Sequence, residues 1–226
     1  MIRLLIFDFD GTIADTKKAY FSSIYRNLEK RGLSKTEINK IIDEGASLRL
    51  ILDKLGLFFI TRWFLHRKIM KEVKNYIDSV HKCQNVYYIK RIKMNKILVS
   101  NSLKWFILKV LRHLNLKDYF SEFYGADEFS EKGKFIKSYI EKHKIKPKEC
   151  VYIGDRVADV KLAKKVGCVG IVVSGKCAWN SREQLEKANP DFLISDFSRL
   201  HRIISFLDQK EDVYYRGSIS SLSIRK

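Results

Sequence analysis

Residues 2–12 read IRLLIFDFDGT, and this stretch decides the fold. Five of its first six residues are apolar, as expected for a strand that is buried on both faces of a sheet. Asp8 and Asp10 follow directly, and Gly11 with Thr12 forms a turn. A buried strand that ends in carboxylates predicts a ligand site at its carboxyl end.

The next segment, from about Asp15 to Cys83, has a helical pattern without a convincing strand. One helix runs through residues 19–28 and stops near Gly32, and Ser34 with Glu37 forms a capping box that opens another. Two more helices are expected over 47–55 and 57–80. We expect the very apolar residues 57–65 to form the small core of this helical block.

Beyond residue 83 short apolar runs alternate with helical segments. Strands are predicted at 97–99, 120–124, 151–153, 169–173 and 192–194, and helices at 103–114, 134–143 and 157–166. The pattern predicts an α/β fold, a Rossmann-like parallel sheet with helices on both faces, plus a small α-helical insertion after the first strand. The predicted boundaries are 1–14 with 84–208 for the core, 15–83 for the helical unit and 209–226 for a basic tail, which is either disordered or an edge strand.

Composition restricts the class of protein and its partners. The 226 residues carry a formal net charge of +18, but the lysines are spread along the chain and no RNP-like or helix-turn-helix motif is present, so nucleic acid is not the expected partner. No apolar run approaches the ~18 residues of a membrane helix, so no membrane partner is expected. Four cysteines without a C-x-x-C pair and the lack of a signal sequence predict a cytoplasmic protein with reduced thiols.

Polar residues follow two more of the predicted strands. Ser100 and Asn101 come after the strand at 97–99, and Asp155 comes after the strand at 151–153, with Asp159 one helical turn later. Carboxylates about 5 Å apart repel by about 3 kcal/mol at an effective dielectric near 20, so the aspartates at this edge need a cation. Oxygen ligands without a nearby His or Cys suit Mg²⁺.

A phosphate group would find donors at the same edge. The Ser100 hydroxyl, Asn101 and the N–H groups at the start of the following helix form an anion site, and Gly11 lets the first loop approach closely. A cation opposite the metal would complete it. We expect Lys132 in that place, with Lys134 as the second candidate.

These motifs resemble those of the haloacid dehalogenase superfamily of phosphotransferases. Residues 8–12 resemble its first motif, Ser100 the second, Lys132 the third and residues 154–159 the fourth, and the resemblance covers roughly 1–14 and 85–200. It implies a catalytic set of Asp8, Asp10, Ser100 and Lys132, a Mg²⁺ site of Asp8, Asp10 and Asp155 supported by Asp159, and phosphate contacts from Gly11, Ser100, Asn101 and Lys132.

By this resemblance Asp8 attacks phosphorus and forms an aspartyl-phosphate, while Asp10 serves as the general acid and base. An aspartate at position 10 favours phosphatases and phosphomutases over the dehalogenases and ion pumps of the superfamily. The helical insertion resembles a C1-type cap, and the stretch through Asn189-Pro190-Asp191 resembles phosphoglycolate phosphatases. Arg49, Arg62 and Arg67 are cap residues that could meet an anionic substrate.

The expected function is therefore Mg²⁺-dependent hydrolysis of a small phosphorylated metabolite by a monomer or homodimer. Two alternatives stay open. A sugar phosphomutase would use the same aspartates but exclude water, and a basic nucleic-acid-binding protein would carry a vestigial phosphatase site.

Overall fold

The centre of the fold is a sheet of six parallel strands in the order β5-β4-β1-β6-β7-β8. The computed structural model describes residues 1–43, 48–53 and 55–214. The strands are β1 (Leu4–Phe7), β4 (Asn95–Val99), β5 (Glu122–Tyr124), β6 (Cys150–Gly154), β7 (Val169–Val173) and β8 (Phe192–Ile194). The predicted α/β class with a parallel sheet is confirmed.

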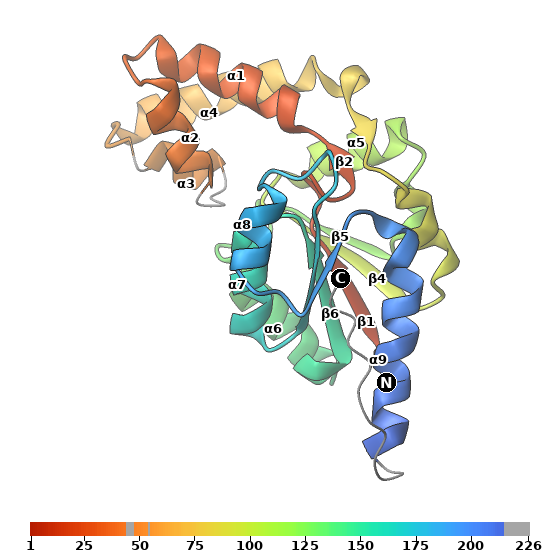
Figure 1. The fold of residues 1–226 in the computed structure, drawn as a ribbon. Helices are drawn as coiled ribbons and strands as arrows, with labels where there is room; N and C mark the ends of the chain where they lie inside the picture. Colours follow the sequence, from red (N-terminus) through yellow and green to blue (C-terminus); the bar gives the residue numbers. More distant parts are fainter. Residues whose placement is uncertain (44–47, 54, 215–226) are drawn as a thin grey trace.

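Helices cover both faces of this sheet, because alternate strand residues point to opposite sides. Leu5 and Phe7 belong to the core cluster that includes α5 (Lys104–His113) and α9 (Leu200–Tyr214). Leu4 and Ile6 belong to the cluster that includes α6 (Lys132–Lys142) and α7 (Val157–Val166). The short helix α8 (Arg182–Lys187) packs beside α7 on that second side (Figure 1).

The segment between β1 and β4 forms a separate group of helices, seen at the top of Figure 1. It contains α1 (Lys17–Glu29), α2 (Lys35–Asp43), α3 (Leu48–Asp53) and α4 (Phe59–Lys74). The chain enters and leaves this helical insertion side by side, through an antiparallel pair of very short strands, β2 (Ala14–Asp15) and β3 (His81–Lys82). The sequence did not predict this pair, because two residues are too few to show alternation.

The apolar run in the insertion differs from its predicted role. Leu65 is buried, but five large side chains at the start of α4 and just before it are exposed: Phe58, Phe59, Ile60, Trp63 and Phe64. The expectation that this run forms the insertion's own core is therefore wrong for these five side chains. The buried side of α4 is supplied by Leu65, Ile69, Met70 and Val73 instead.

Several short elements complete the chain. Short 3₁₀-helices occupy Ile77–Ser79, Val86–Arg91, Lys117–Tyr119, Pro147–Glu149 and Phe197–Arg199. The part of the predicted tail from 209 to 214 continues α9, and 215–226 lie outside the described residues. In the described ranges no helix has both the length and the apolar character needed to cross a membrane.

Candidate functional site

The loop after β1 carries two of the predicted site residues, Asp8 and Asp10. Asp8 is buried, and its N–H donates to the carbonyl of Ile153 over 2.8 Å, which ties the loop to the end of β6. Gly11 then turns the chain with a φ of +76°. A Cβ at Gly11 would lie 2.3 Å from an Asp155 carboxylate oxygen, so this position accepts glycine alone.

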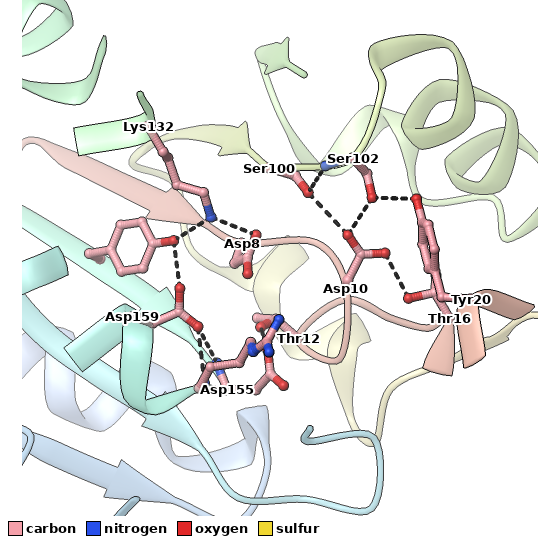
Figure 2. A network of polar contacts seen from close by, with 12 residues as sticks. Asp8, Asp10, Thr12, Thr16, Tyr20, Ser100, Ser102, Lys132, Asp155 and Asp159 are labelled. Carbon is pink, nitrogen blue, oxygen red and sulfur yellow. Dashed lines mark hydrogen bonds and ion pairs between the residues drawn. The ribbon is translucent and has the colours of Figure 1, made fainter. Parts of the chain in front are cut away.

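Lys132 opens α6 and places its ammonium group in this site. Its Nζ donates to Asp8 Oδ1 and to the Tyr152 hydroxyl, both over 2.9 Å (Figure 2). Lys134 instead points to solvent, with a side chain 79% exposed that pairs with Glu131. Burial alone would lower the pKa of Lys132, but the carboxylates around it outweigh burial and raise that pKa, so the ammonium stays charged.

Three buried carboxylates converge beside this lysine. Asp8, Asp155 and Asp159 each offer an oxygen, and the three oxygens lie within 4.8 Å of one another. Burial raises the pKa of Asp155 well above its usual value, and the charges of Asp159 and Asp8 raise it further. The Trp179 N–H and the Thr12 hydroxyl oppose this by donating to Asp155 over 2.7 and 2.8 Å.

This cluster suits a divalent cation. One lysine does not balance three carboxylates, and a pair of them at 4.8 Å repels by about 3 kcal/mol at an effective dielectric of 20. Buried oxygen donors of this kind fit a hard ion. Asp159 also shapes the site, because its Oδ2 accepts the N–H groups of Asp155 and Arg156 over 3.1 and 3.0 Å.

Asp10 points away from the carboxylate cluster into a set of hydroxyl donors. Its Oδ1 accepts from Thr16 over 2.7 Å, and its Oδ2 accepts from Ser102 over 2.5 Å and from Ser100 over 3.2 Å (Figure 2). Burial raises the pKa of Asp10 to about 6, with a further contribution from the Asp8 charge, while these hydroxyl bonds act in the lowering direction. Asp8 and Asp10 thus have different surroundings although they are two residues apart.

Ser100 and Asn101 lie between β4 and α5, and both line the cavity at the site. The Ser100 hydroxyl accepts the N–H of Ser102 over 3.0 Å while it donates to Asp10. Gly11 does not line the cavity. Asp155 and Trp179 leave no room for a Cβ at this position, which is a different reason for glycine there. The predicted phosphate contacts of these residues stay predictions.

The cavity has a volume of about 710 Å³ and is bounded by both parts of the chain. The core supplies Asp8, Asp10, Ser100, Lys132 and Asp159 among others, and the insertion supplies six side chains: Tyr20, Ile24, Leu48, Asp53, His66 and Met70. Of the three arginines named from the sequence, Arg62 pairs with Asp53 at 2.5 Å and Arg67 stacks on Trp63 at 4.7 Å. The side chain of Arg49 lies outside the described residues.

Sequence reasoning missed several residues that hold this site together. Thr12 lies in the first motif and Ser102 directly follows Ser100 and Asn101, so both could have been found from the sequence. Tyr152 was hidden in an apolar strand, where its hydroxyl bridges Lys132 and Asp159 at 2.9 and 3.0 Å. The other three are Thr16, Tyr20 and Trp179, and only the folded chain brings them to the site.

Comparison with known proteins identifies a family model and relatives that match most of this chain. The family model described as Haloacid dehalogenase-like hydrolase matches residues 5–173. A phosphoglycolate phosphatase of Vibrio vulnificus is 24% identical over 222 residues, which cover 90% of this chain and 96% of that protein.

Solved structures agree on the fold. A predicted phosphatase from Clostridium acetobutylicum superimposes with a TM-score of 0.75 at 20% identity, covering 91% of this chain and 99% of that one. A predicted phosphoglycolate phosphatase from Haemophilus somnus gives 0.74 at 18% identity, with 90% and 98% covered.

Proposed function

The chain belongs to the haloacid dehalogenase-like hydrolase family, as a phosphatase, and on that premise we propose that it hydrolyses a small phosphomonoester through a phosphoryl group carried on Asp8. One observation carries the proposal. The Lys132 ammonium lies 2.9 Å from Asp8 Oδ1, beside the acidic cluster. The second aspartate of the loop, Asp10, lies on the same cavity and has a pKa that burial raises to about 6. A nucleophile, a cation and an acid thus face one cavity.

In the first step an Asp8 carboxylate oxygen attacks phosphorus, and the bond from phosphorus to the leaving oxygen breaks. Asp10 donates its proton to that oxygen, which its raised pKa of about 6 supports. Lys132 offsets the negative charge on the transferring phosphoryl oxygens.

In the second step Asp10, now a carboxylate, takes a proton from water as the water oxygen attacks phosphorus. The acyl-phosphate bond to Asp8 breaks, and inorganic phosphate leaves. The hydroxyl groups of Thr16 and Ser102 stabilise the Asp10 carboxylate between the two steps.

We propose Mg²⁺ as the cation of the acidic cluster, held by Asp8, Asp155 and the backbone carbonyl of Asp10, with Asp159 in support. When bound, Mg²⁺ would neutralise the phosphate oxygens and the crowded carboxylates together. The oxygen-only donor set and the raised pKa of Asp155 support this assignment.

We further propose that residues 15–83 act as a cap on a catalytic core of 1–14 and 84–208. The cavity walls support this division, because side chains of α1 and α4 close one side of it. A small phosphorylated metabolite would fit such a cavity, and the Vibrio vulnificus relative makes phosphoglycolate the first substrate to test.

The central test is Asp8→Asn, assayed by Mg²⁺-dependent phosphate release from p-nitrophenyl phosphate and from a panel of phosphorylated metabolites. We expect turnover to be lost while the circular dichroism spectrum is kept, because the amide cannot form the phosphoryl intermediate. The matched control is Asp118→Asn, an exposed aspartate outside the site. Near-wild-type turnover by Asp8→Asn would refute the nucleophile, and conversion of a hexose 1-phosphate without phosphate release would favour the mutase.

A further inference from the structure

A hydroxyl relay leads from the helical insertion to Asp10. The Tyr20 hydroxyl lies 2.7 Å from Ser102 Oγ, and Ser102 donates to Asp10 Oδ2 over 2.5 Å (Figure 2). While Asp10 is ionised, its bond from Ser102 uses the single hydroxyl hydrogen of that serine. In that state Tyr20 is the donor to Ser102, and the relay runs toward Asp10.

The Tyr20 side chain is fixed by the core rather than by its own helix bundle. It is 7% exposed, and its ring packs edge-on against Phe106 of α5 with centroids 5.5 Å apart. The Trp179 ring lies 6.3 Å away on the core side, from the loop whose backbone N–H also holds Asp155. A rigid aromatic ring held in this way delivers its hydroxyl to one place.

The first turn of α1 supplies a second contact to the same aspartate. Thr16 precedes α1 directly and donates to Asp10 Oδ1 over 2.7 Å. Tyr20 lies four residues later, one helical turn on, so that both side chains face the same way. Asp10 is thus held at both oxygens by one turn of the insertion, at Oδ1 directly and at Oδ2 through Ser102.

We propose that Tyr20 is a positioning residue, which aligns the general acid Asp10 through Ser102 when α1 is seated on the core. The inference rests on the proposed function, because it takes Asp10 as the proton donor. Tyr20 itself transfers no proton to substrate. Its contribution is to keep the Ser102 hydroxyl aimed at Asp10, so the acid loses alignment if the insertion moves away.

The test compares leaving groups in Tyr20→Phe, which removes only the hydroxyl. An alkyl phosphate needs its leaving oxygen protonated, whereas p-nitrophenolate leaves readily without a proton. We expect kcat/KM to fall about 10-fold for the alkyl phosphate that the wild type hydrolyses fastest, and by less than about two-fold for p-nitrophenyl phosphate. The matched control is Tyr76→Phe, a tyrosine of the insertion whose hydroxyl contacts Arg26.

A double-mutant cycle tests the path of the effect. If Tyr20 acts through Ser102, adding Tyr20→Phe to Ser102→Ala produces no further loss on the alkyl phosphate. Equal losses on both substrates, multiplying losses in the double variant, or the same split in Tyr76→Phe would each overturn the inference. Failure of the wild type to release phosphate would instead refute the proposed function, so the two failures are distinguishable.

Discussion

Replacing Asp155 by asparagine should make the metal-free protein more stable, although it removes a buried native group. Asp155 is fully buried within 4.8 Å of two other carboxylates. One such pair at that distance costs about 3 kcal/mol at an effective dielectric of 20. The cost is limited to about 4 kcal/mol at pH 7, since beyond that Asp155 would take up a proton instead.

The asparagine has a cost of its own. Its amide oxygen can still accept from the Thr12 hydroxyl. Its NH₂ group replaces the oxygen that accepted the Trp179 N–H, and the loss of that hydrogen bond costs about 1 kcal/mol. Relief of about 3 kcal/mol of repulsion less about 1 kcal/mol for the lost hydrogen bond predicts that Asp155→Asn raises the free energy of unfolding by about 2 kcal/mol at pH 7 in EDTA.

The same calculation gives a pH dependence. The pKa of Asp155 is raised in the folded protein, so the folded state binds its proton more tightly than the unfolded chain does. The contribution of Asp155 to wild-type stability is therefore greatest below the unfolded pKa of about 4 and is lost as pH rises toward the folded pKa. The stabilisation by Asp155→Asn should shrink accordingly on acidification toward pH 4.

The assay is urea denaturation in EDTA and again in millimolar Mg²⁺, with Asp118→Asn as the exposed control. Mg²⁺ should stabilise the wild type and the control but not Asp155→Asn, because the ion needs that carboxylate. The reasoning fails if Asp155→Asn is less stable than wild type in EDTA, or if Mg²⁺ stabilises both proteins equally.

Three further outcomes are expected. Because Asp10 has a pKa of about 6 and must be protonated to act as the acid, kcat/KM for an alkyl phosphate should fall about ten-fold per pH unit above pH 6, and a flat profile to pH 8 would contradict this. Gly11→Ala should lower the free energy of unfolding by more than about 2 kcal/mol, since its φ is +76° and the new methyl would lie 2.4 Å from a Trp179 carbon; an unchanged melting temperature would count against that packing. Tyr152→Phe removes a hydroxyl with two buried partners, and urea denaturation should show a loss of about 1–2 kcal/mol, whereas a loss below about 0.5 kcal/mol would mean that these bonds contribute nothing net.

Much of the core was predictable because its strands are buried on both faces and read as continuous apolar runs. That signal located β1, β4, β6 and β7, and their carboxyl ends located the acidic residues. Helices α8 and α9 escaped prediction, as did the two-residue strands at the base of the insertion. The two strands and the six-residue α8 carry too short a pattern to stand out, whereas α9 has apolar residues at helical spacing (Leu200, Ile203, Ile204 and Leu207), a signal that was present but not used.

The site was predictable where a residue lies in a motif, and not where only the fold brings it near. Lys132 was preferred over Lys134 because a Lys-Gly start to a helix, followed by a strand that ends in Gly-Asp, resembles the layout of the haloacid dehalogenase superfamily. The structure puts its ammonium against Asp8. Tyr20 and Trp179 belong to an insertion helix and a late loop, and no spacing in the chain relates them to Asp10 or Asp155. Such contacts depend on how the insertion is seated, which periodicity does not encode.

The central place of β1 sets the order in which this enzyme can be completed during synthesis. Its first residue, Leu4, pairs with Asn95 on one side and with Cys150 on the other. About two thirds of the chain must leave the ribosome before the aspartates of the first loop meet their partners. The crowded charges therefore cannot oppose the early stages of folding, and the three carboxylates can capture an ion together only once β1 has paired with β6.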